Sequence, residues 1–145
     1  MSALAVSVPG IQPEVAAPAR IVVLSAGHVA ASSTARLAGL LGAAAAEALG
    51  TAGRAGEVEH LELRRFALDV TSALLGGERT ASLAAAVASV QAADAVVVVT
   101  PTINASFSGL LKSFLDVLPV DALRSVPVTI AYRTVSEAPI PTHTA

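Results

Sequence analysis

Short runs of β-branched residues alternate along this chain with longer segments rich in alanine and leucine. The run Ala95–Thr100 contains four consecutive valines, and Ile21–Ser25 is almost as apolar. Neither run alternates between apolar and polar residues, which is the pattern of a strand covered on both faces. Buried strands that alternate with helices predict an α/β fold with a parallel sheet.

Two further strands are predicted, which brings the recognisable strands to four. Glu57–Leu63 is interspersed with charged residues and suits the edge of a sheet better than its centre. Val126–Ala131 is another apolar run, and the residues after it, which include two prolines, have the period of neither a helix nor a strand. We therefore expect one domain over residues 21–131, followed by an irregular tail over 132–145.

Three helices are predicted between these strands. The first begins at the N-cap residues Ser32, Ser33 and Thr34 and runs to about Leu49. The others span Ala81–Ala92 and Ser108–Leu118, whereas Phe66–Arg79 has no clear period and is expected to be irregular. The first helix is expected to bury one continuous face, made of Leu37, Leu40, Leu41, Ala44, Ala45 and Ala48.

The N-terminal segment does not resemble a secretory signal. A signal begins with a charged region followed by an unbroken apolar core, whereas here the first basic residue is Arg20 and prolines interrupt the preceding run. We expect residues 1–20 to form a disordered extension. The most apolar stretches, such as Ala92–Thr100, are much shorter than the roughly 20 residues of a membrane-spanning helix, so we expect no membrane association.

The composition excludes several classes of function. A net charge of −2 provides no electrostatic surface for nucleic acid. The chain has no cysteine, so it can form neither a disulfide scaffold nor a thiolate metal site, and no other cluster has metal-ligand spacing. Absence of cysteine fits a reducing compartment, and we expect a cytoplasmic protein.

Two loops that follow predicted strands carry unusual chemistry. The first, Ser25–Thr34, lacks both the G-x-G-x-x-G dinucleotide fingerprint and the phosphate loop of nucleotide triphosphatases. It is rich in hydroxyl groups and opens onto a helix N-terminus, where free N–H groups and the helix dipole suit a terminal phosphate. An alternative is that Ser32, Ser33 and Thr34 only cap the helix, and their spacing fits both interpretations.

The second loop, Pro101–Phe107, follows the most apolar strand. Pro101 stiffens its start, and Asn104 suits a tight turn. From residues Thr100 to Asp116 the sequence reads T-P-T-I-N-A-S-F-S-G-L-L-K-S-F-L-D. Taken alone, this segment could be an ordinary connection between a strand and a helix.

Together the two loops resemble those of the NADPH-dependent FMN reductase family. The family pattern after the third strand is T-P-x-[YF]-N-x-S-x-x-G-L-L-K-x-x-x-D, and the resemblance extends over about Ile21–Ala131. It implies a flavodoxin-like, doubly wound parallel sheet. It also implies that Ser25, Ser32, Ser33 and Thr34 hold the FMN phosphate, and that the isoalloxazine ring lies against Pro101, Thr102, Ile103 and Asn104.

The chain departs from the family pattern in two places. Ile103 stands where the family usually has an aromatic residue. The family also continues after the fourth strand with a Gly-rich loop, a helix, a fifth strand and a last helix, of which residues 132–145 show no sign. The expected sheet is therefore incomplete, as in a truncated protein.

The function implied by the resemblance is hydride transfer from NADPH or NADH to FMN, with reduced flavin passed to a partner monooxygenase by a homo-oligomeric enzyme. Such chemistry depends on orienting the cofactor, so no catalytic acid or base is expected. The alternatives are a non-catalytic electron carrier and an inactive remnant of the reductase. We interpret His28 as a solvated loop residue, His60 as part of an exposed edge strand, and Lys112 with Asp116 as a pair on a helix surface.

Overall fold

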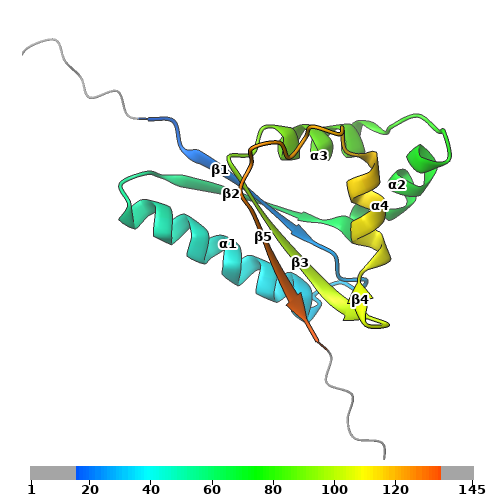
Figure 1. Ribbon diagram of the computed structural model, residues 1–145, viewed down its shortest axis with the longest axis horizontal. Helices are drawn as coiled ribbons and strands as arrows, with labels where there is room; N and C mark the ends of the chain where they lie inside the picture. The colour runs from blue at the N-terminus through cyan, green and yellow to red at the C-terminus, as the bar shows by residue number, and fades with distance from the viewer. Residues whose placement is uncertain (1–15, 135–145) are drawn as a thin grey trace, which may run out of the picture.

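The computed structural model describes residues 16–134, in which four parallel strands form the main sheet (Figure 1). β1 (Ala19–Ser25) pairs with β2 (Gly56–Glu62) on one side and with β3 (Ala95–Ile103) on the other. β5 (Val128–Arg133) pairs with the opposite edge of β3. All these pairings are parallel, so the predicted parallel α/β sheet is confirmed.

Helices cover both faces of the sheet, as in a doubly wound flavodoxin-like fold (Figure 1). α1 (Ser33–Thr51) packs on one face, and α2 (Ala67–Leu74), α3 (Ala81–Gln91) and α4 (Gly109–Val117) lie on the other. Alternate residues of β1 and β3 enter the two separate cores, which explains why neither strand alternates in polarity. Within the described residues, no helix is both long and apolar enough to cross a bilayer.

The ends of several elements differ from their sequence-based bounds. β1 begins at Ala19, because the Ala19 amide donates to the Ala55 carbonyl at 2.8 Å and the Arg20 amide donates to the Asp94 carboxylate at 2.8 Å. β5 extends to Arg133, two residues into the predicted tail. These extensions depend on partners distant in the sequence, which local patterns do not reveal.

The segment expected to be irregular contains two short helical elements. A 3₁₀ turn at Leu63–Phe66 leads directly into the eight-residue helix α2. The expectation was wrong because α2 is too short to display a helical period, and Val70 is its one fully buried side chain. The charged edge strand was correctly predicted, since β2 pairs with β1 alone among the described residues and is largely exposed.

The buried face of α1 is rotated from the predicted one. Leu40, expected in the core, is 70% exposed, and Ala44 and Ala48 are also exposed. Instead Ala38 and Gly42 lie nearest the sheet, and a Cβ atom on Gly42 would be 2.9 Å from Val58 Cγ1 and 3.0 Å from Val23 Cγ2. Leu37, Leu41 and Ala45 of the predicted face do pack against the core, but the spacing of the leucines did not reveal that the close approach of helix and sheet requires small residues at the contact.

Two glycines of α1 provide a matched test of this packing. Gly39→Ala should stabilise the protein by about 1 kcal/mol, because alanine favours a helix and no atom lies within 4 Å of the new Cβ. Gly42→Ala has the same helical preference but overlaps Val23 and Val58, and overpacking costs about 1–3 kcal/mol. Urea unfolding of both variants should therefore show a lower stability for Gly42→Ala, and equal stabilisation would contradict the close approach.

Candidate functional site

A pocket of about 250 Å³ opens at the carboxyl ends of β1, β3 and β5. Ligands of open α/β sheets bind at this edge. Six of the eight predicted site residues line the pocket, which is bounded by Gly27, His28, Val29, Ser32, Ser33, Thr34, Pro101, Thr102, Ile103 and Arg133. The structure thus brings the two predicted loops together, although they are far apart in the sequence.

The start of α1 forms the hydroxyl-rich wall of the pocket. Ser32 is the N-cap residue, and its Oγ accepts a hydrogen bond from the Ala35 amide at 3.1 Å. Gly27 is packed so closely that a Cβ atom there would collide with Ser32 Oγ. The Ser32 hydroxyl accepts this bond and keeps its own hydrogen to donate, and the Ser33 and Thr34 amides have no partner within the helix. Capping and anion binding are therefore compatible.

The second predicted loop is instead a tight hairpin. β3 continues to Ile103, and β4 (Ser106–Phe107) returns antiparallel to it. Asn104 and Ala105 at the tip have φ values of 49° and 59°, which asparagine tolerates better than alanine does. Asn104 does not line the pocket, because the hairpin carries it beyond Pro101, Thr102 and Ile103.

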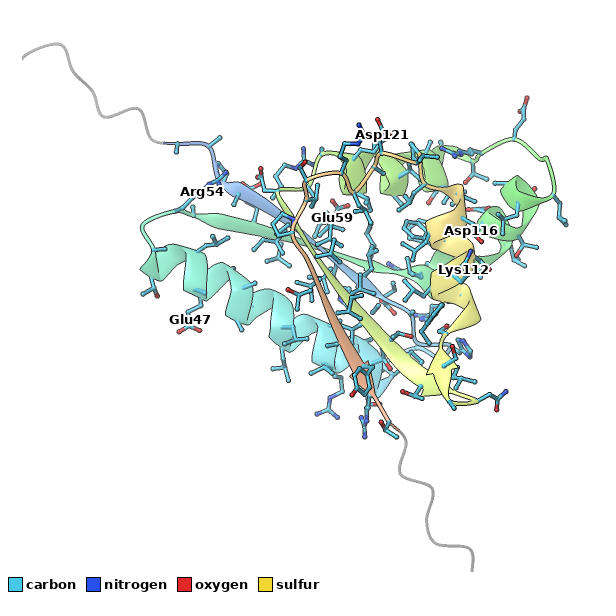
Figure 2. All side chains as sticks on the ribbon, in the orientation of Figure 1. Glu47, Arg54, Glu59, Lys112, Asp116 and Asp121 are labelled. Carbon is cyan, nitrogen blue, oxygen red and sulfur yellow. The ribbon has the colours of Figure 1, made fainter. Side chains whose placement is uncertain are left out.

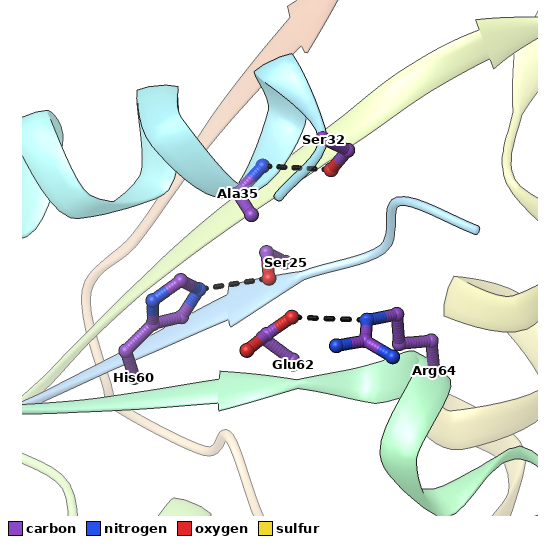
Figure 3. A network of polar contacts seen from close by, with 6 residues as sticks. All are labelled: Ser25, Ser32, Ala35, His60, Glu62 and Arg64. Carbon is purple, nitrogen blue, oxygen red and sulfur yellow. Dashed lines mark hydrogen bonds and ion pairs between the residues drawn. The ribbon is translucent and has the colours of Figure 1, made fainter. Parts of the chain in front are cut away.

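Ser25 is the last residue of β1 and does not line the pocket. Its side chain is 2% exposed, and its Oγ is 2.8 Å from His60 Nε2 on β2 (Figure 3). His60 is on the exposed edge strand, as interpreted, but its ring reaches the end of β1. This contact connects β1 to β2. The phosphate-binding role of Ser25 stays a prediction.

His28 connects the two loops. Its Nε2 lies 3.1 Å from the Oγ of Ser108, which also accepts the Leu110 amide at 3.2 Å as the N-cap of α4. The Ser108 amide in turn donates to Thr100 Oγ1 at 2.9 Å. His28 is exposed but bonded, so its interpretation as a simply solvated residue was incomplete. The chain of contacts holds the walls of the pocket at a defined separation.

Arg133 is a site residue that the sequence did not reveal. It lies at the end of β5, paired in register with Pro101, and lines the pocket together with the hydroxyl residues of α1. Sequence reasoning assigned it to the irregular tail. The available signal was its position just beyond a predicted parallel strand, at the edge where ligands bind. Among the described lining residues no carboxylate offsets its charge.

Lys112 and Asp116 remain outside the pocket. They form the predicted ion pair between successive turns of α4 and point away from the sheet (Figure 2). Exposed pairs of this kind contribute little to stability. Lys112 and Asp116 therefore form a surface ion pair on α4, as predicted, and do not belong to the pocket.

The cap at Ser32 can be compared with a second cap distant from the pocket. Thr80 caps α3 by accepting the Leu83 amide at 3.1 Å, the same distance as in the Ser32 cap. Ser32→Ala and Thr80→Ala should each lower the free energy of unfolding by about 1 kcal/mol. Thermal and urea unfolding measure this, and an unchanged stability for Ser32→Ala alone would show that its cap contributes nothing.

Comparisons with known proteins agree with this architecture. Residues 19–138 match the family model of NADPH-dependent FMN reductases. Among curated proteins, none matches significantly. An oxidoreductase from Corynebacterium diphtheriae is similar in structure, with a TM-score of 0.76 and 34% identity over 79% of this chain and 63% of its own.

Two other solved structures are also similar. The apo form of an NADH:FMN oxidoreductase, EMOB, has a TM-score of 0.59 and 36% identity over 72% of this chain and 52% of its own. An azoreductase from Bacillus anthracis shares the fold, with a TM-score of 0.54 and 16% identity over 83% of this chain and 73% of its own. The chain thus spans about half to two thirds of the two more similar relatives. From the family match over residues 19–138, the chain belongs to the NADPH-dependent FMN reductase family.

Proposed function

We propose that this protein is an FMN reductase that transfers hydride from NADPH or NADH to FMN. The observation that carries the proposal is the pocket itself, which is lined by the hydroxyl residues at the start of α1, by Arg133 and by Pro101–Ile103. This combination suits a ligand with a phosphate at one end and a flat ring at the other.

The phosphate would lie at the start of α1. Ser32, Ser33 and Thr34 provide hydroxyl donors, and the Ser33 and Thr34 amides point out of the first turn. Arg133 adds a positive charge to the lining of the same pocket, and with Ser33 it also lines an adjacent cavity. A single cluster of donors fits one terminal phosphate, which favours FMN over FAD because the dinucleotide glycines are absent.

The ring would lie against Pro101, Thr102 and Ile103. These residues form the last part of β3, where the hairpin and the Ser108–Thr100 hydrogen bond hold the backbone. When bound, FMN would supply the redox chemistry, since its ring can accept hydride from a reduced nicotinamide ring. The protein's own residues would bind the phosphate and orient the ring.

We further propose a cytoplasmic homo-oligomer that supplies reduced flavin to a monooxygenase. The supply of reduced flavin is supported by sequence motifs that resemble those of such reductases. The cytoplasmic location is supported by the absence of cysteine. A coupled assay with a flavin-dependent monooxygenase, compared with and without physical separation of the two proteins by a dialysis membrane, would show whether reduced flavin is delivered.

The phosphate assignment predicts a difference between two flavins. Replacing Ser32, Ser33 and Thr34 together by alanine should weaken FMN binding at least about tenfold, because hydrogen bonds to a charged group contribute about 1.5–3 kcal/mol. Riboflavin, which lacks the phosphate, should bind almost as before. Fluorescence titration of both flavins measures this.

Thr80→Ala is the matched control, because it removes a cap of equal length without approaching the pocket. All proteins should be compared at a temperature where circular dichroism shows them to be folded. If FMN and riboflavin weaken equally in the triple variant, the start of α1 does not hold the phosphate. Absence of flavin-dependent NADPH oxidation by the unaltered protein would contradict the proposed enzymatic function.

A further inference from the structure

The two outer strands of the main parallel sheet differ in charge. β2 forms one edge and carries Glu57, Glu59 and Glu62. Charged side chains on an edge strand discourage pairing with another sheet. β5 forms the other edge, and no further strand within residues 16–134 pairs with it. From Val128 to Tyr132, β5 has neither a charged residue nor a proline, so it lacks the features that keep a new strand from joining the sheet.

Backbone groups of β5 point alternately toward β3 and toward the open edge. The Pro127 carbonyl accepts the Val96 amide at 3.0 Å, in the register that pairs Val96 with Val128. Since each residue of a strand directs its N–H and C=O groups to one side and the next residue to the other, alternate residues after Pro127 face outward. These outward-facing residues are Val128, Ile130 and Tyr132.

The same three residues carry exposed apolar side chains. Val128 is 39% exposed, Ile130 is 66% exposed and Tyr132 is 72% exposed. They stand on the face of the sheet that bears α2, α3 and α4, because the valines that Val128 and Ile130 pair with on β3 enter that core. On the other face, the exposed Leu40 of α1 lines a cavity together with Arg133 at the end of β5. Apolar surface therefore flanks the open edge on both faces of the sheet.

A second β5 strand fits this edge in one antiparallel register. With Ile130 opposite Ile130 of the second copy, Val128 lies opposite Tyr132 of that copy, and every outward amide and carbonyl of the three residues meets a partner. A shift by one residue would place outward groups against inward ones, and a shift by two would leave Val128 or Tyr132 without a partner in the strand. Directly opposed residues share a face of the sheet, so the exposed apolar side chains also meet in this register.

We propose that two copies of this chain pair through antiparallel β5 strands, which joins their sheets into one. The pairing specifies the interface of the homo-oligomer proposed above, and it needs neither flavin nor coenzyme. The contact is two-fold symmetric and therefore closes at a dimer. Two short strands bury less than the roughly 1,200–2,000 Å² of a stable interface, so we expect a dimer that dissociates on dilution.

Sedimentation velocity of the flavin-free protein tests the pairing. The unaltered protein should change from dimer to monomer as it is diluted. Ile130→Lys should raise the dimer dissociation constant at least about tenfold, because two ammonium groups would face each other across the symmetry axis. Leu68→Lys introduces the same charge at an exposed position of α2 and should leave the dissociation constant within about twofold.

Opposite charges at the same position provide a rescue. Ile130→Glu alone should dimerise as weakly as Ile130→Lys, whereas an equal mixture of the two variants should associate more tightly than either alone, because carboxylates then face ammonium groups. The proposal is overturned by a monomer at every concentration of the unaltered protein, by larger assemblies in place of a dimer, by unchanged dimerisation of Ile130→Lys, or by a mixture that associates no more tightly than its components.

Disulfide cross-linking tests the register and captures even a weak dimer. The chain has no cysteine, so a single introduced cysteine reports one distance between the two copies. Ile130→Cys should form a covalent dimer on oxidation with diamide, because the opposed Cα atoms would lie about 5.5 Å apart. Val128→Cys should not, since the two residues at that position would be four places apart along the strands, or about 14 Å, which a disulfide cannot span.

Leu68→Cys measures cross-linking by random collision, and circular dichroism shows whether each variant is folded. Cross-linking of Val128→Cys or Leu68→Cys equal to that of Ile130→Cys would overturn the proposed register. None of these measurements uses flavin. Absence of flavin reduction by the unaltered protein would therefore contradict the proposed enzymatic function alone, while sedimentation and cross-linking would still decide the β5 pairing.

Discussion

Backbone pairing on both edges of β3 determines where every residue of the site lies. β1 and β5 run parallel to β3 over the same four valines, so the three carboxyl ends meet at one edge of the sheet. The valines enter separate cores on the two faces, and this burial makes β3 the most constrained element of the fold. The loop that follows β3 therefore starts from a backbone position that is fixed by strand pairing on both sides.

Short polar contacts hold together the loops and helix starts at this edge of the sheet. Ser32 caps α1 and Ser108 caps α4, while His28 joins the loop before α1 to Ser108. The two serine caps each accept an N-terminal amide that would otherwise lack a partner, whereas the His28–Ser108 contact joins two side chains. At the start of α1 the cap uses the Ala35 amide, and the Ser33 and Thr34 amides have no partner within the helix.

The predicted site residues come together where their positions follow from the ends of parallel strands. Pro101 lies in the last part of β3 and Ser32 caps the helix that follows β1, and both line one pocket. Arg133, which also lines the pocket, was missed because its position depends on the length of β5, and the hairpin formed by β3 and β4 was missed because its tip is strained. Neither the pairing of distant strands nor an alanine at positive φ leaves a signal in local sequence patterns.

By itself, the sequence determined the four parallel strands, the three longer helices between them and the family, because apolar runs and the motif from Thr100 to Asp116 are local properties. Tertiary structure alone decided which face of α1 is buried and where Ser25 lies. At Gly42 the close approach of helix and sheet requires a small residue, and the Ser25 hydroxyl contacts His60 of β2 and does not line the pocket. Both outcomes depend on atoms brought together from distant positions, and burial and hydrogen bonding are decided by that proximity.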